Sequence, residues 1–356
     1  MRRAVIMAGG AGVRLWPLSR KNRPKQLLRL FSGASLLRQS FERVAAMLDP
    51  EQIYVITNHV HLPMVAQELP EVPAANLIGE PIGRDTANAV GLSAAVLAQC
   101  DPDAIIGMFT ADHIITPMDR FCAAVNQAYE TAERLPDALV TMGIRPTRPD
   151  TNYGYVRRGE RISEGLFKVE KFTEKPNMAS AMKYLGSGEY YWNSGMFAWR
   201  ASAILQQIEK QLPPSYACIR EIADAWNREE RHQKLESLYP NLLKISIDFG
   251  VMERAENMLV VEMDCHWVDV GSWPAIESVI GADGNGNVLA GGRAVHLGSR
   301  GNIVVCDDEH LVATIGVDDL VIVHSPDATL VCTRRDAQSI KELVDNVEKQ
   351  FGKQYI

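Results

Sequence analysis

The feature that most constrains the fold is an alternation of short apolar runs with helix-patterned segments over the first 143 residues. Apolar runs at Ala4–Met7, Ile53–Thr57 and Ala104–Phe109 are typical of buried strands. Apolar residues recur at helical spacing over residues 37–48, and an alanine-rich segment follows Thr86. Strands that alternate with helices need crossover connections. We therefore predict an α/β fold with a doubly wound, mixed but mostly parallel sheet.

The pattern changes twice further along the chain. After about Tyr153 the runs are longer, which predicts partly antiparallel strands, and Gly281–Asn287 has the composition of a linker. Four short apolar runs between residues 302 and 333 predict a small β-rich unit, and an amphipathic helix is expected around Ala337–Phe351. We therefore predict one domain over residues 1–280 and a β-rich C-terminal domain, ending in a helix, over residues 287–356.

Charge and composition exclude several classes of protein. The chain has 37 Lys and Arg against 44 Asp and Glu, a net charge of −7. General nucleic-acid binding depends on clustered basic residues, so nucleic acid is not an expected partner. The six cysteines form no CxxC pair, which fits a reducing compartment. No apolar stretch approaches the roughly 20 residues that span a bilayer, so we expect a cytoplasmic protein without a membrane segment.

The first predicted strand leads into a glycine-rich, basic segment, Gly9–Gln26. Glycines allow a backbone to approach phosphate closely, and Arg14 and Lys25 add positive charge. Neither familiar phosphate motif fits, because no GK[ST] follows and Leu15 occupies the position of the third glycine in GxGxxG. On the glycines alone, a tight turn with solvated basic residues explains the segment equally well.

The complete string resembles the signature of the nucleoside-diphosphate-sugar pyrophosphorylases, most closely the mannose-1-phosphate guanylyltransferase branch. That signature reads GGxGTRLWPLSR followed by PKQ, and the chain departs from it at Val13, where the family usually has Thr. The resemblance implies a Rossmann-like nucleotidyltransferase fold in which Arg14 and Lys25 hold the triphosphate and the leaving pyrophosphate. It also implies nucleotide contacts from Ala8, Gly9, Gly10 and Gly12.

The segment Gly79–Ala89 resembles the family string EPxGRNTAPA, which is thought to lie against the base. A carboxylate such as Glu80 can accept from the N1–H and the 2-amine of guanine. The alternative is a loop followed by a helix cap at Asp85 or Thr86, and both interpretations are compatible. The resemblance implies that nucleotide is bound by Glu80, Gly83, Arg84, Thr86 and Asn88.

Asp112 follows the predicted strand at Ala104–Phe109, where a Mg²⁺ ligand of an α/β enzyme would lie. A single Asp in a turn is common and does not by itself indicate a metal site. Asp269 lies 157 positions further along the chain, so sequence spacing gives no reason to pair it with Asp112 as a second ligand. The resemblance implies that Asp112 and Asp269 are the two Mg²⁺ ligands. His113 by itself looks like a zinc ligand, but no matching partner spacing supports that interpretation.

Three later strings, KFTEKP, WNSGMF and SIDFGVME, resemble the family's sugar-site motifs. By that match Glu174 would bind sugar hydroxyls and Lys175 the sugar phosphate, whereas a plain Glu–Lys pair on a strand is usually a surface feature. Gly154 would allow close approach of the sugar ring. The sugar-binding residues implied by the resemblance are Gly154, Glu174, Asn193 and Asp248, with Lys175 beside Arg14 and Lys25 as a catalytic residue.

The matches occur in the family's order from Met1 to about Pro274. They imply a transferase that uses Mg²⁺, GTP and mannose 1-phosphate, and that makes GDP-mannose and pyrophosphate by in-line attack on the α-phosphate. A homodimer is one assembly the chain allows. Two alternatives stay open: a glucose-1-phosphate uridylyl- or thymidylyltransferase, and a regulatory subunit that binds nucleotide sugar without turnover.

Overall fold

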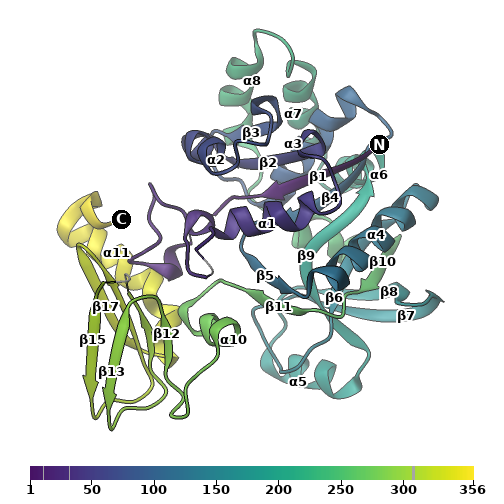
Figure 1. Cartoon of the computed structure of the whole chain (residues 1–356). Coiled ribbons are helices and arrows are strands. Elements are labelled where there is room, and N and C mark those ends of the chain that lie inside the picture. The colour runs from purple at the N-terminus through teal and green to yellow at the C-terminus, as the bar shows by residue number, and fades with distance from the viewer. Residues whose placement is uncertain (11, 32, 307–308) are drawn as a thin grey trace. The chain divides into compact units, whose positions relative to one another are not determined.

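The computed structural model describes residues 1–10, 12–31, 33–306 and 309–356 (Figure 1). The chain forms two compact units, each assembled from separate stretches of sequence. Unit 1 comprises Met1–Gly9, Phe41–Thr110 and Ile115–His266. Unit 2 comprises Gly10–Ser40, Ala111–Ile114 and Trp267–Ile356. The predicted domains, residues 1–280 and 287–356, are each continuous in sequence, whereas both units are discontinuous. The boundary between residues 280 and 287 therefore stays a prediction.

Unit 1 is built on a nine-stranded sheet in the order β3-β2-β1-β4-β9-β6-β10-β8-β7. Strands β8 and β9 run antiparallel to their neighbours, and the other seven share one direction. The predicted mixed, mostly parallel sheet is therefore confirmed. The strands are β1 (Arg2–Met7), β2 (Ile53–Asn58), β3 (Leu77–Glu80), β4 (Ile105–Thr110), β6 (Leu139–Ile144), β7 (Tyr155–Ser163), β8 (Leu166–Thr173), β9 (Tyr190–Arg200) and β10 (Met258–Glu262).

Helices cover both faces of this sheet. On β4, Ile106 and Met108 belong to the buried cluster that contains α3, whereas Gly107 between them lies under Tyr129 of α4. Side chains alternate across a strand, so α3 and α4 must lie on opposite faces. The helices of unit 1 are α2 (Leu62–Glu68), α3 (Thr86–Cys100), α4 (Met118–Arg134), α5 (Met178–Ser187), α6 (Ala201–Gln211), α7 (Pro213–Asp224), α8 (Arg231–Leu238) and α9 (Ile247–Gly250). α1 (Leu36–Ala45) has residues in both units, and α10 (Glu277–Ile280) and α11 (Ile340–Phe351) belong to unit 2.

The C-terminal part of unit 2 is a parallel coil of short strands. From β12 to β16 successive strands alternate between a sheet that contains β12, β14 and β16 and a pair formed by β13 and β15. β17 then joins the first sheet, antiparallel to β16. This arrangement confirms the predicted small β-rich unit, which α11 closes as expected. The strands are β12 (Val288–Ala290), β13 (Arg293–Leu297), β14 (Ile303–Val305), β15 (Leu311–Ile315), β16 (Leu320–Ser325) and β17 (Ala328–Thr333).

The glycine-rich N-terminal loop belongs to the core of this second unit. Leu15 and Leu28 pack in one cluster with Val321 and Val323 of β16. The indole Nε1 of Trp16 donates to the carbonyl of Tyr355 at 2.8 Å. Residues from the two ends of the chain therefore share one apolar core.

None of the helices in the described ranges is long and apolar enough to cross a membrane.

The contact between β4 and α4 generates a stability prediction. A Cβ at Gly107 would overlap the buried phenol of Tyr129, whose hydroxyl donates to the carbonyl of Arg3 at 2.8 Å. We expect Gly107→Ala to lower the free energy of unfolding, measured by urea denaturation, by about 1–3 kcal/mol. Gly186→Ala in α5 is the matched control, because a Cβ there meets no heavy atom within 4 Å. It should be neutral or stabilising, and equal losses in both variants would contradict the packing argument.

Candidate active site

The predicted phosphate loop adopts a backbone that requires glycine. Gly10 and Gly12 have φ values of 100° and 60°, in the region that other residues rarely adopt. A Cβ at Gly12 would lie 2.5 Å from Cβ of Lys25 and 2.9 Å from the hydroxyl of Ser19. Gly12 therefore lets the Lys25 stem pass directly against the loop.

Two other predicted loop residues already have partners within their own units. The backbone N–H of Ala8 donates to Ile56, and its carbonyl accepts from the Thr57 hydroxyl at 2.9 Å, so Ala8 is tied to β2. Arg14 is exposed, and its Nη1 donates to Gln338 Oε1 at 3.1 Å. Arg14 would exchange this neutral partner for any anion that the loop binds.

The structure brings Lys25, Asp112, His113 and Asp269 together in unit 2. The ammonium of Lys25 forms an ion pair with Asp112 Oδ2. Nε2 of His113 lies 3.6 Å from Asp112 Oδ1 and 4.0 Å from Asp269 Oδ1. One oxygen or nitrogen of each of Asp112, His113 and Asp269 falls within 4.8 Å of the others, a spacing that suits the surroundings of a divalent metal ion.

Strand pairing produces this convergence. Asp112 stands between β4 and β5 (His113–Thr116), and Asp269 ends β11 (His266–Asp269), which pairs with β5. The N–H of Val270 donates to the Asp112 carbonyl at 3.1 Å. Two carboxylates distant in sequence are thus placed side by side by backbone hydrogen bonds.

Opposite charge keeps Lys25 and Asp112 ionised although both side chains are largely shielded from solvent. Burial opposes the charge on Lys25, but the carboxylates of Asp112 and Asp269 outweigh it and raise the pKa of Lys25. Burial also opposes the charge on Asp112, but Lys25 outweighs it and lowers the pKa of that carboxyl. Both groups are therefore charged at neutral pH.

His113 is held from its other side by an aromatic neighbour that sequence reasoning missed. Nε1 of Trp267 lies 3.1 Å from Nδ1 of His113, and the two rings meet edge to face with centroids 5.0 Å apart. Both side chains are buried. Trp267 stands two positions before Asp269 on β11, and no motif of the sequence distinguished it from a core tryptophan.

In unit 1, Glu80 is a buried carboxylate at the end of β3. The hydroxyl of Tyr239 donates to its Oε1 at 2.5 Å, and a Cβ at Gly9 would lie 3.8 Å from its Oε2. Burial raises the pKa of Glu80 to about 7, although the Tyr239 hydrogen bond works in the opposite direction. Tyr239 was not predicted, because nothing in the sequence connects it to β3.

The other residues of the Gly79–Ala89 segment mainly build the start of α3. The Asp85 carboxylate accepts from the N–H of Thr86 at 2.8 Å, which confirms the predicted helix cap. The Thr86 hydroxyl accepts from Ile247 N, and Asn88 is fully buried, with Nδ2 donating to the carbonyls of Arg84 and Leu243. Gly83 is exposed, and Arg84 donates to the carbonyl of Pro240.

The predicted sugar-binding residues also converge within unit 1. Asn193 donates from Nδ2 to Asp248 Oδ1 at 2.9 Å, and its Oδ1 accepts from the Thr141 hydroxyl at 3.0 Å. A Cβ at Gly154 would overlap Oε2 of Glu174 and lie 3.3 Å from Cβ of Asn193. Gly154 is therefore needed first of all for the Glu174 side chain.

Two carboxyls in this group disfavour their charged form. Burial, and then the neighbouring Glu174 carboxylate, raise the pKa of Asp248 to about 7. Burial also raises the pKa of Glu174, against the effect of the adjacent Lys175, whose Nζ lies 3.0 Å from Glu174 Oε1. The N–H of Glu174 donates to Glu253 Oε1 at 2.9 Å. Raised carboxyl pKa values in a polar cluster are typical of ligand sites.

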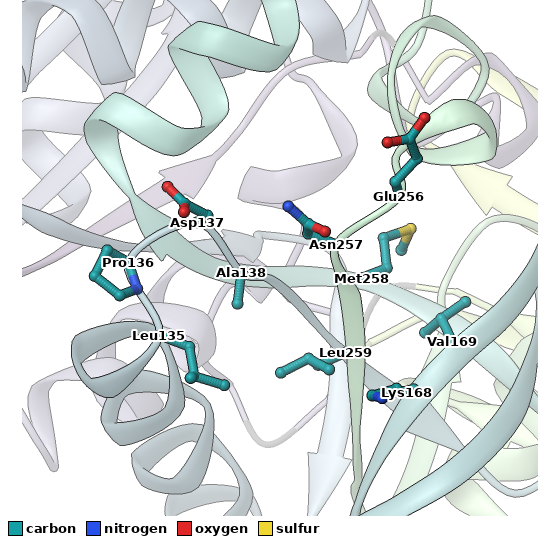
Figure 2. A pocket seen from close by; sticks show the side chains of 10 residues that line it. All are labelled: Leu135, Pro136, Asp137, Ala138, Lys168, Val169, Glu256, Asn257, Met258 and Leu259. Carbon is teal, nitrogen blue, oxygen red and sulfur yellow. The ribbon is translucent and has the colours of Figure 1, made fainter.

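A separate cavity of about 330 Å³ lies in unit 1, where the strands β6 and β10 begin (Figure 2). Figure 2 shows Ala138, Met258 and Leu259 at the starts of β6 and β10, with Lys168 and Val169 of β8 beside them. None of the predicted site residues lines it.

Comparisons with known proteins show the family of the chain. Residues 3–285 match the nucleotidyl transferase family, and residues 292–347 match a MannoseP isomerase/GMP-like beta-helix domain. Mannose-1-phosphate guanylyltransferases of Escherichia coli and Klebsiella pneumoniae are each 39% identical over 99% of this chain and 75% of their own length. A crystal structure from Thermus thermophilus, described as a mannose-1-phosphate geranyltransferase, is 37% identical. It has a TM-score of 0.87 and covers 98% of this chain and 99% of that one.

The raised pKa of Asp248 predicts how stability depends on pH. Between the usual carboxyl range near 4 and about 7, the folded chain binds more protons at Asp248 than the unfolded chain does. Stability should therefore fall as pH rises through that window. We expect Asp248→Asn to lose less stability than wild type over this range. Between pH 5 and pH 7.5, the decrease in its free energy of unfolding, measured by urea denaturation, should be smaller than that of wild type by about 1–3 kcal/mol. Asp264→Asn, at an 80% exposed side chain, should keep the wild-type slope. An unchanged slope in Asp248→Asn would refute the assignment.

Proposed function

The chain belongs to the mannose-1-phosphate guanylyltransferases of the nucleotidyl transferase family, and from this premise we propose that it transfers GMP from GTP to mannose 1-phosphate. The products are GDP-mannose and pyrophosphate. The observation that carries the proposal is the convergence of Lys25, Asp112 and Asp269, which combines a cation with two carboxylates in one cluster. We propose a cytoplasmic homodimer as the working form.

The chemistry needs charge control more than acid–base catalysis. Mannose 1-phosphate is already a dianion at neutral pH, so its oxygen can attack the α-phosphorus without a general base, and the main barrier is repulsion between two polyanions. In the proposal, Lys25 and Arg14 hold the triphosphate and then the leaving pyrophosphate, and Lys175 holds the attacking sugar phosphate. In the proposal, these cations reduce the repulsion between the two polyanions before reaction.

Asp112 and Asp269 would hold the metal ion, which we propose is Mg²⁺. Carboxylate oxygens, with water and phosphate, are the ligands that Mg²⁺ prefers, and both side chains keep part of their surface exposed, 19% for Asp112 and 32% for Asp269. When bound, the ion supplies charge neutralisation at the α-phosphate. The Lys25–Asp112 ion pair would have to be shared or exchanged as substrate enters.

The remaining site residues would recognise substrate. The backbone from Ala8 through Gly9, Gly10 and Gly12 would approach the phosphates. Oε2 of Glu80 would accept from guanine while Tyr239 holds Oε1. Gly83, Arg84, Thr86 and Asn88 would form and support the wall beside the base. The proposed sugar-binding residues are Gly154, Glu174, Asn193 and Asp248.

A pyrophosphate-release assay tests the reaction and the cation–carboxylate cluster together. With Mg²⁺, each nucleoside triphosphate in turn, and mannose 1-phosphate or glucose 1-phosphate, we expect release only with GTP and mannose 1-phosphate. Lys25→Gln and Asp112→Asn should each lower turnover by about 10²–10³-fold, because a charged group at the transition state is lost. Lys21→Gln is the matched control, since Lys21 lies on the same loop and pairs with Glu348.

The outcomes of this assay separate the alternatives. Preference for UTP or dTTP with glucose 1-phosphate would replace the proposed substrates and keep the fold and chemistry. Binding of nucleotide sugar without release would favour the regulatory subunit. Loss of the thermal unfolding transition in Lys25→Gln or Asp112→Asn would make that residue structural.

The base preference depends on Glu80. ITP lacks the 2-amine of guanine and ATP lacks both donors, so kcat/KM should fall in the order GTP, ITP, ATP. Glu80→Gln should lower the GTP-to-ATP ratio by about 10- to 100-fold, because hydrogen bonds to a charged acceptor are lost. Since the pKa of Glu80 is about 7 in the free protein, the KM for GTP should rise below pH 7 in wild type and not in Glu80→Gln. A ratio that Glu80→Gln leaves unchanged would refute this role.

A further inference from the structure

We infer that Trp267 sets the metal preference of the Asp112–Asp269 site, by keeping the proton of His113 on Nε2 so that this histidine cannot be a ligand. The inference rests on the proposed role of the two aspartates as metal ligands. It assigns a function to two residues outside the proposed set, His113 and Trp267, both of unit 2.

By composition alone, the cluster should favour a transition metal. Asp112, His113 and Asp269 present two carboxylates and one imidazole within 4.8 Å. A donor set with imidazole suits Zn²⁺ and its neighbours in the first transition row, which bind nitrogen more strongly than Mg²⁺ does. The nitrogen that faces the carboxylates is Nε2 of His113, at 3.6 Å from Asp112 and 4.0 Å from Asp269.

The hydrogen bond from Trp267 decides the state of that nitrogen. The indole N–H can only donate, and it lies 3.1 Å from Nδ1 of His113. Nδ1 must therefore present its lone pair. A neutral imidazole carries one N–H, so the proton is on Nε2.

Protonated Nε2 is a donor that faces the two carboxylates, and it has no lone pair for a metal. This is the reverse of a typical histidine ligand, which binds metal with one nitrogen and donates a proton from the other. His113 thus lies beside Asp112 and Asp269, at 3.6 Å and 4.0 Å, without offering a lone pair to their metal ion. The protein then offers only oxygen ligands to the bound ion. Such a ligand set suits Mg²⁺ and lowers the affinity for Zn²⁺.

The strands place these groups with little freedom. Trp267 and Asp269 are two positions apart on β11, so their side chains point to the same face, and β5 with His113 is its pairing partner. Edge-to-face contact between the two rings, at 81° and 5.0 Å, holds the imidazole plane. The indole therefore controls both the orientation and the proton of His113.

Metal titration of the full chain without nucleotide tests the inference. Trp267→Phe keeps an aromatic ring and removes the donor, so His113 can move its proton to Nδ1 and offer Nε2. We expect Zn²⁺ to bind this variant about tenfold tighter or more than wild type, and Mg²⁺ affinity to change by less than about threefold. Adding His113→Ala to Trp267→Phe should abolish the gain. Trp273→Phe, which removes another buried indole hydrogen bond of the same unit, should leave the Zn²⁺ affinity unchanged.

Nitrogen-15 NMR of the histidine rings gives a readout that is independent of metal binding and of activity. The resonances absent from His113→Ala identify His113, and in wild type they should show a protonated Nε2 and an unprotonated Nδ1. A proton on Nδ1, or wild-type Zn²⁺ binding that His113→Ala weakens, would overturn the inference. Failure of wild type to bind Mg²⁺ or Mn²⁺ would overturn the underlying metal assignment, while lack of activity with intact metal binding would count only against the proposed reaction.

Discussion

The indole of Trp16 connects the two ends of the chain, and the glycine-rich loop that we propose binds phosphate depends on it. Its Nε1 donates to the carbonyl of Tyr355 at 2.8 Å, and its own carbonyl accepts from Nε1 of Trp273 at 3.1 Å. Arg20, four residues further along, pairs with Asp327 at 2.5 Å. A glycine-rich loop would lose much of its entropy on binding phosphate, and this anchoring restricts it beforehand. The β-rich C-terminal segment is therefore part of the structure that positions Arg14 and Lys25.

The two units manage buried charge in different ways. In unit 2, Lys25 and Asp112 offset each other, so both stay ionised. In unit 1, Glu80 and Asp248 are buried beside hydroxyl or amide groups and other carboxyls, and their pKa values rise to about 7. The first arrangement suits charged phosphates and metal. The second leaves acceptors that a neutral base or sugar can satisfy with N–H and O–H groups.

Much of the fold could be predicted because its signals are local. The apolar runs that predict β1, β2 and β4 are continuous, as expected for strands buried on both faces. Asp85 caps α3 as predicted, because a cap involves neighbouring residues only. The position of β9 between β4 and β6 was not predictable, since pairing order depends on residues far apart in the chain.

By itself, the sequence determined the family, the strand–helix alternation and the glycines that the loop after β1 requires, since each is encoded in adjacent residues. Only the tertiary structure decided which side chains act together. It placed Asp269 beside Asp112, Tyr239 against Glu80 and the Trp267 indole against His113. Hydrogen bonding, proton position and pKa depend on groups a few ångströms away in space, and residues more than 150 positions apart leave no periodic or spacing signal by which their contact could be read.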